Sequence, residues 1–130
     1  MGELIRKDLI YPDLSYQVIG SLFSVHTGLG SGHRESFYQK AIAKEFESRG
    51  IEYKKELPAK ISYKKEIVGM YYFDFLVENK IVLETKVRDY FSKKDIDQLY
   101  SYLKAKNYKL GIIAHFTKSG VKCKRVVNLD

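Results

Sequence analysis

The spacing of the apolar residues changes near the middle of this 130-residue chain, and the change limits the folds that the chain can adopt. Before Gly50, apolar residues recur every three or four positions, as they do along the buried side of a helix. This spacing predicts one helix that ends at "GLGSG", residues 28–32, and a second helix over about residues 33–49. After Gly50, most apolar residues follow the patterns of strands.

The part of the chain after Gly50 is predicted to contain strands and one further helix. The predicted helix covers residues 92–106, and the predicted strands cover residues 51–58, 59–65, 68–77, 80–87, 108–116 and 123–129. This order predicts an α/β (α+β) fold in which helices flank one mixed central β-sheet. No repeat, low-complexity tract or flexible linker interrupts the sequence, so we expect a single domain over residues 1–130.

The composition narrows the class of partner and the kind of metal site. Lys and Arg total 23 against 16 Asp and Glu, and the formal charge of +7 favours an anionic partner such as nucleic acid. A basic surface that only keeps the protein in solution would give the same charge, so both interpretations stay open at this point. Cys123 is the single cysteine, which excludes intrachain disulfides, four-cysteine zinc sites and cysteine-ligated iron–sulfur clusters. Oxygen or histidine ligands would have to hold any metal ion.

No apolar run approaches the roughly 18 residues that a membrane-spanning helix needs. The N-terminus also lacks the pattern of a secretory signal. We therefore expect a cytoplasmic protein that does not enter a membrane.

The segment "IVLETKV", residues 81–87, has the apolar character of a strand buried on both faces, yet it contains Glu84 and Lys86. Isolated charges in such a strand are costly unless another group compensates them. Strand alternation places Glu84 and Lys86 on the same face. A three-residue turn at residues 78–80 would set Asp74 of the preceding strand opposite Glu84, whereas a two-residue turn would not. An odd-numbered turn therefore predicts that two carboxylates and one amine gather together.

Two close carboxylates repel each other unless a cation lies between them, and a divalent metal ion supplies that cation. Oxygen ligands without cysteine favour a hard ion such as Mg²⁺, for which Mn²⁺ can substitute, with positions left for water and phosphate oxygens. Lys86 could then orient a water molecule toward phosphorus and stabilise the charge of the transition state. The alternative is a buried ion pair without a catalytic role.

The predicted helices add polar residues that have two interpretations each. Glu35, on the inward side of the second helix, is either a metal ligand or part of the helix N-terminus, in a capping box with Gly32 as N-cap. Gln98 and Tyr102 are one turn apart on the third helix. They can hydrogen-bond to a phosphate, a base edge or Lys86, or they can simply border the core.

In order and spacing, these residues resemble the GxxExxY family of the PD-(D/E)XK nuclease superfamily. The residues that carry the resemblance are Gly32-x-x-Glu35-x-x-Tyr38, Asp74, Glu84-x-Lys86 and Gln98-x-x-x-Tyr102. The likeness extends from "LIYPDLSYQVIG" and "VHTGLG" to "YKLGII" and "KRVVN". The resemblance implies a restriction-endonuclease-like core of αβββαβ order with an extra N-terminal helix. It also implies metal-dependent hydrolysis of phosphodiester bonds, which we expect to be those of DNA.

The resemblance assigns roles to the residues of the strand pair. It implies that Asp74 and Glu84 are metal ligands, often joined by the backbone carbonyl of Thr85, and that Lys86 is the catalytic lysine. Two positions depart from the superfamily pattern. Phe73, rather than proline, precedes Asp74, and Thr85 replaces the more common apolar residue between the acid and the lysine.

The helical residues match the pattern less directly. Glu35 matches an acidic residue that the first core helix often contributes to the metal site. Gln98 and Tyr102 match the Q-x-x-x-Y motif of nucleases that are coupled to recombination helicases, and we expect them to steady the substrate or the lysine. His26 is either a metal ligand, as in some related nucleases, or a histidine hydrogen-bonded within the core.

Arg88, Lys93 and Lys94 are the expected phosphate contacts, because they lie close in sequence to the charged strand and to the start of the third helix. Two other functions stay open. The chain can be a binding module that keeps the fold without cutting nucleic acid, or a structural partner whose basic surface is incidental. A nuclease that cuts both strands of a duplex can act as a twofold homodimer.

Overall fold

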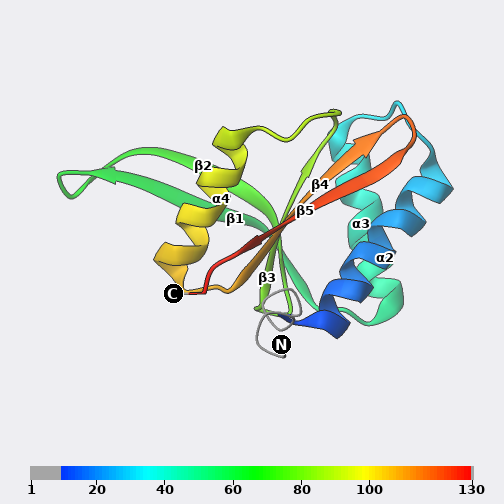
Figure 1. The fold of residues 1–130 in the computed structure, drawn as a ribbon, viewed down its shortest axis with the longest axis horizontal. Coiled ribbons are helices and arrows are strands. Elements are labelled where there is room, and N and C mark those ends of the chain that lie inside the picture. The colour runs from blue at the N-terminus through cyan, green and yellow to red at the C-terminus, as the bar shows by residue number, and fades with distance from the viewer. Residues whose placement is uncertain (1–9, 130) are drawn as a thin grey trace, which may run out of the picture.

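The computed structural model describes residues 10–129, in which a central β-sheet lies between helices on both faces (Figure 1). The elements are α2 (Pro12–Leu29), α3 (Glu35–Arg49), β1 (Tyr53–Tyr63), β2 (Glu66–Val77), β3 (Ile81–Lys86), α4 (Lys93–Lys106), β4 (Leu110–Thr117) and β5 (Gly120–Val127). The predicted α/β (α+β) fold, with its αβββαβ core and extra N-terminal helix, is confirmed. Residues 1–9 and 130 of the predicted domain lie outside the described residues.

The sheet is mixed, and its strands lie in chain order from β1 to β5. The pair β3–β4 is parallel, and the other three pairs are antiparallel. Parallel neighbours need a crossover connection, which α4 provides. β3 and β4 are therefore central strands covered on both faces, which explains their almost continuous apolar sequences.

Residues 53–63 form one long strand, although the sequence predicted two strands that meet between Pro58 and Ala59. Proline cannot donate to a β-ladder, but β1 is an edge strand, where that loss is tolerated. β1 and β2 stay paired beyond the last β2–β3 pair, Phe75 with Leu83. Residues 57–73 thus form a two-stranded projection, the arm, which extends away from the rest of the sheet (Figure 1).

The two faces of the sheet pack against different helices. On one face, side chains of α2 and α3 such as Leu22 and Phe46 pack against Phe75 and Leu83. On the other face, Leu99 and Leu103 of α4 pack against the sheet, where the buried residues include Val82, Ile113 and Phe73. Gly111 of β4 permits this close approach, because a Cβ atom at that position would lie 2.7 Å from a methyl carbon of Leu99.

α3 begins later than the sequence predicted. Arg34 is its N-cap and Glu35 its first residue, so the capping box with Gly32 as N-cap is wrong. Gly32 instead belongs to the preceding connection, where its φ of +88° favours glycine. Within residues 10–129, no helix combines the length and apolar character that crossing a membrane requires.

Candidate functional site

The turn between β2 and β3 sets the positions of the charged residues. Glu78 and Asn79 both have positive φ, and the Lys80 amide donates a hydrogen bond of 2.9 Å to the Val77 carbonyl. Val77 pairs with Ile81, so the predicted three-residue turn at residues 78–80 is confirmed. Continued along the strands, this register sets Asp74 opposite Glu84, one position beyond the last β2–β3 pair. The two acids therefore lie where the strands begin to separate.

Asp74 is held at this separation by hydrogen bonds from two other elements. Its carboxylate accepts from the backbone amide and the hydroxyl of Thr85, each at 2.7 Å, and from the Gln39 side chain at 3.0 Å. Hydrogen bonds to an ionised carboxylate are among the stronger ones in proteins, so they fix the acid between β2 and β3. The sequence analysis did not single out Gln39, although it lies one helical turn after Glu35 and thus on the same side of α3.

Glu84 and Lys86 extend from the α4 face of β3, as Val82 does. The Lys86 Nζ atom lies 3.8 Å from a Glu84 carboxylate oxygen, and the two side chains are 22% and 14% exposed. Burial, together with the charge of Asp74 and a hydrogen bond to it, raises the pKa of Glu84 to about 9, against the opposing effect of Lys86. Near neutral pH and without a metal ion, Glu84 therefore holds a proton.

Glu35 brings a third carboxyl group toward the same point from the start of α3. Partial burial raises the pKa of Glu35 most, and the charge of Asp74 raises it further. Lys86, the backbone N–H of Val87 and the Arg88 guanidinium act in the opposite direction. These influences show that Glu35 faces the end of β3, close to both Asp74 and Lys86.

The described residues place the predicted metal ligands in one region without bringing them into ligating positions. As the side chains stand, residues 10–129 contain no group of three or more Asp, Glu, His or Cys side chains that could hold a metal ion. The donors do suit a hard cation, because all are oxygens and because Asp74 raises the pKa of both glutamates. Thr85, the fourth predicted ligand, binds Asp74 through its amide and hydroxyl groups.

Gln98 and Tyr102 lie on the side of α4 that faces the arm, and each lines a hollow there. The Tyr71 hydroxyl of the arm donates to the Gln98 backbone carbonyl at 3.5 Å. Burial raises the pKa of Tyr71, and the charge of Glu84 raises it further. The Tyr71 ring also packs against the ring of Phe73, the residue before Asp74, with 5.2 Å between centroids. The Tyr102 ring packs against Phe73, with 4.8 Å between ring centroids.

The predicted phosphate contacts differ in whether an acidic side chain already pairs with them. Arg88 forms an ion pair of 3.2 Å with Asp95, which neutralises much of its charge toward a ligand. Lys93 forms an exposed ion pair of 2.7 Å with Asp97, while Lys94 is exposed beside it at the start of α4. Both lysines line the hollow beside Gln98. Binding of phosphate by these residues stays a prediction.

Two histidines have defined surroundings. The Nε2 atom of His26 lies 2.8 Å from the Thr117 carbonyl oxygen, which matches a histidine hydrogen-bonded within the core.

His115 is fully buried next to Lys86 in the parallel β3–β4 register, and it stacks on Phe91 with 4.0 Å between centroids. Neither ring nitrogen of His115 has a hydrogen-bond partner among the described residues, and burial lowers its pKa. The sequence analysis missed this neighbour of Lys86, because only the parallel register reveals it.

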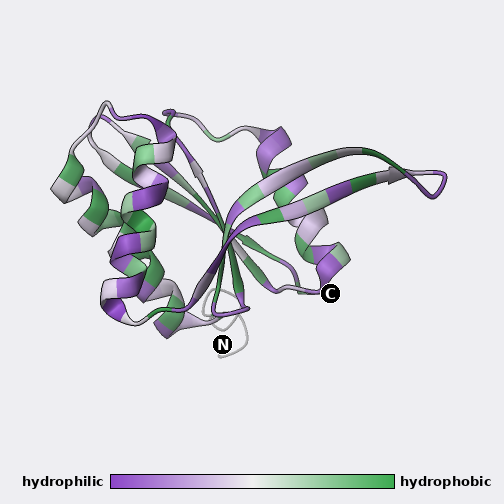
Figure 2. Cartoon of the chain, turned by 180° about the vertical axis from the view of Figure 1, so that it is seen from behind, coloured by the Kyte–Doolittle hydropathy of each residue, from purple (hydrophilic) through white to green (hydrophobic). Residues whose placement is uncertain are grey.

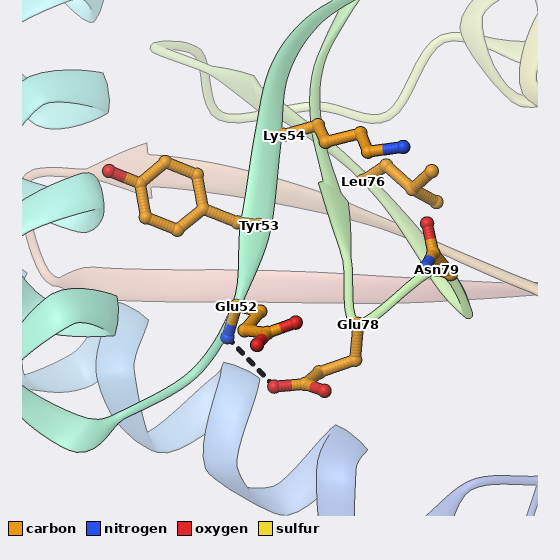
Figure 3. Close-up of a pocket in the computed structure, with 6 residues that line it drawn as sticks. All are labelled: Glu52, Tyr53, Lys54, Leu76, Glu78 and Asn79. Atoms are coloured by element: carbon orange, nitrogen blue, oxygen red, sulfur yellow. Dashed lines mark hydrogen bonds between the residues drawn. The ribbon is translucent and has the colours of Figure 1, made fainter.

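A small pocket of about 70 Å³ lies at the opposite end of β2 and β3, beside their turn (Figure 3). Figure 3 shows the Glu78 carboxylate accepting a hydrogen bond from the Glu52 amide, which is 2.7 Å long. This bond ties the turn to the start of β1. None of the predicted site residues lines the pocket, so we assign it to the structure of the turn.

Three comparisons relate the chain to known proteins. A family model described as the PD-(D/E)XK nuclease superfamily matches residues 12–126. A solved structure titled "Crystal structure of SSO0001" is similar over 90% of this chain and 78% of its own, with 14% sequence identity and a TM-score of 0.45. No curated protein sequence matches the chain.

Proposed function

From the premise that the chain belongs to the PD-(D/E)XK nuclease superfamily, we propose that it is a metal-dependent nuclease that hydrolyses phosphodiester bonds in DNA. Within the superfamily we assign it to the GxxExxY family, on Gly32, Glu35 and Tyr38. The observation that carries the proposal is the arrangement at the end of β3. There the Lys86 Nζ atom lies 3.8 Å from a Glu84 carboxylate oxygen, and Asp74 of β2 accepts a hydrogen bond from the Thr85 amide of β3. A metal-dependent site of the D…ExK type requires two acids and an amine close together, and this arrangement supports one at the end of β3.

The residues that would hold the metal ion are Glu35, Asp74, Glu84 and the backbone carbonyl of Thr85. Mg²⁺ is the proposed ion, and Mn²⁺ would substitute for it, because both prefer oxygen ligands. When bound, the ion supplies positive charge that favours ionised water and neutralises the phosphate. Binding requires Glu84 to lose the proton that its pKa of about 9 retains near neutral pH.

The remaining residues act on the water and on the substrate. The Lys86 amine reaches the same space as the Glu84 carboxylate, so it can orient the attacking water and stabilise the negative charge that develops on the phosphate. Gln98 and Tyr102 would steady the substrate from α4. Lys93 and Lys94 would contact its phosphates, with Arg88 closer to the acids.

Cleavage assays test the proposal directly. Supercoiled plasmid, linear duplex, single-stranded and branched DNA, and RNA are each incubated with Mg²⁺, with Mn²⁺ or with EDTA. We expect cleavage of DNA that requires a divalent ion and is lost in Glu84→Gln. The matched control is Glu52→Gln, which changes an exposed glutamate beside the pocket of Figure 3 and should cut as the wild type does. Absence of metal-dependent cleavage from every substrate would refute a nuclease function.

A second candidate is a binding module that keeps the fold and does not cut. The arrangement of the acids favours it. Asp74 accepts hydrogen bonds from Gln39 and Thr85, and among the described residues no three acidic side chains converge closely enough to hold a metal ion. Calorimetric titration with Mg²⁺ separates the two functions. Heat of binding in the wild type that disappears in Asp74→Asn and Glu84→Gln supports the nuclease, whereas equal traces for all three proteins support the binding module.

A further inference from the structure

The arm and α4 border a groove, and it is lined in part by four residues that the proposed function places in contact with substrate, Lys93, Lys94, Gln98 and Tyr102. It consists of two adjoining hollows of about 680 and 610 Å³, which share Ile61, Tyr71 and Ser101 as lining residues. We call it the arm–helix groove. Figure 1 shows the arm passing α4 and projecting beyond it, and Figure 2 shows the same arrangement from behind. Each hollow is as large as an ordinary small-molecule site of about 300–1,000 Å³.

The lining of the groove combines positive charge with apolar and aromatic surface. Lys60 of β1 and Lys93, Lys94 and Lys106 of α4 line it, and Asp97 is the single acidic residue among the described lining residues. Ile61 is 42% exposed there, although it is a large apolar side chain. Two rings, Tyr71 and Tyr102, complete the wall between the arm and the helix. A polyanion that carries flat apolar groups fits this combination.

One end of the groove approaches the carboxylates. Tyr71, which lines both hollows, donates to the Gln98 carbonyl on one side. On its other side, the Tyr71 ring packs against the Phe73 ring, with 5.2 Å between centroids, and Phe73 directly precedes Asp74 in β2. A chain molecule that lies in the groove would therefore pass close to Asp74 and its neighbours.

We propose that the arm–helix groove binds one unpaired nucleic-acid strand and leads it to the carboxylate end of β3. The proposal rests on the nuclease function above and names its substrate as unpaired. Bases of a single strand expose their faces and stack on aromatic and apolar side chains such as Tyr71 and Ile61, whereas a duplex hides those faces. The lysines of the groove would contact the phosphates of the same strand.

Binding without cleavage tests this proposal. Fluorescence anisotropy in EDTA compares labelled oligothymidylate and oligouridylate of about 15 nucleotides, close to the largest sites of single-strand binders, with a duplex of the same length. We expect the unpaired strands to bind about tenfold more tightly than the duplex, a difference equal to one stacked base. The two unpaired probes show whether DNA or RNA is preferred. Equal or tighter binding of the duplex would overturn the proposal.

Matched variants locate the binding surface. Ile61→Ser should weaken binding of oligothymidylate about tenfold, whereas Ile67→Ser should not, because Ile67 is a 57% exposed arm residue outside the groove. Lys106→Ala should reduce the slope of log Kd against log salt concentration by about 0.7, the value for one phosphate of a single strand. Lys44→Ala, the same change on α3, should leave that slope unchanged. Unchanged binding in both groove variants would overturn the proposal.

The two proposals fail in distinguishable ways. If the wild type cuts DNA in a Glu84-dependent manner but the groove variants bind as the wild type does, the groove proposal is wrong and the nuclease function stands. If the groove variants lose binding while no substrate is cut, the groove is a binding site and the nuclease function is wrong. Thermal unfolding of each variant shows whether lost binding reflects an unfolded arm.

Discussion

The two faces of the central sheet are built from the same strands but are covered very differently. On the α2–α3 face, Ile81 and Leu83 of β3 are completely buried in an apolar core. On the α4 face, Val82 is equally buried, but the next two residues of that face are Glu84 and Lys86, which remain partly exposed. A single strand of alternating side chains thus anchors the core on one side and carries the proposed catalytic groups on the other. The contrast teaches that α4 covers only part of the sheet face against which it packs. The part at Val82 is covered, and the part at Glu84 and Lys86 is open.

The largest expected effect concerns the open part of the α4 face. Lys86→Ala should reduce the cleavage rate about 10²- to 10⁴-fold, because it removes the group that orients water and stabilises charge. The thermal midpoint should change little, since Lys86 is partly exposed and its ion pair of 3.8 Å is long. Single-turnover cleavage and thermal unfolding of the same preparation measure both quantities. A variant that cuts at the wild-type rate would show that this face carries no chemistry through Lys86.

On the α2–α3 face, a substitution should lower stability and leave the cleavage rate unchanged. Leu83→Ala should lower the free energy of unfolding by about 3 kcal/mol, because it leaves a cavity in the core between β3 and the two helices. Folded Leu83→Ala protein should retain its cleavage rate at low temperature, since the side chain points away from Glu84. Urea unfolding and cleavage assays below the unfolding range test the pair of outcomes. A rate loss as large as that of Lys86→Ala would remove the distinction between the faces.

The packing of α4 on the covered part of its face can be tested at the close contact between Gly111 and Leu99. Gly111→Ala should cost about 1–3 kcal/mol, because the new methyl group would lie 2.7 Å from a Leu99 carbon. Gly69→Ala is the matched control, since its Cβ atom would lie 3.9 Å from Ile61 without a clash. A double variant with Leu99→Ala should cost less than the sum of the two single changes. If the losses of unfolding free energy add in the double variant, as measured by urea unfolding, Leu99 does not pack tightly against Gly111.

Measured per pH unit, the smallest effect is the pH dependence caused by Glu84 in the absence of metal. The folded protein raises the pKa of Glu84 from 4.5 to about 9, so the stability that this group contributes is complete below pH 4.5 and is lost as the pH rises through 9. In EDTA, the wild type should lose up to about 1.4 kcal/mol per pH unit within that window. Glu84→Gln, which cannot ionise, should flatten this slope. If urea unfolding gives the same dependence on pH for the wild type and Glu84→Gln, the pKa of Glu84 is not raised in the folded protein.

The sequence was most informative where a local pattern determines the structure. The turn at residues 78–80 could be predicted, because three polar residues there separate two strand-like apolar runs. The strand break at Pro58 was wrong, because the edge position of β1 depends on the order of the strands and not on local sequence.

Tertiary neighbours account for what the sequence did not reveal. His115 meets Lys86 only through the parallel pairing of β3 with β4, and no spacing in the sequence indicates which strands are adjacent. Tyr71 was one tyrosine among 11 until the arm placed it against Gln98 of α4 and against Phe73, the residue before Asp74. Gln39 had a usable signal, one turn after Glu35, but an amide among many polar residues carries little weight alone.

The hydrogen bond from the Thr85 amide to Asp74 would make one backbone position sensitive to the ion that the proposed function requires. In the metal-free protein this amide proton is shielded by a carboxylate and not by a neighbouring strand. An ion that draws Asp74 toward itself would lengthen or break that bond and speed exchange of the proton with solvent. The Thr85 amide would then act as a built-in reporter of metal loading, readable by NMR in protein that carries no label on its side chains.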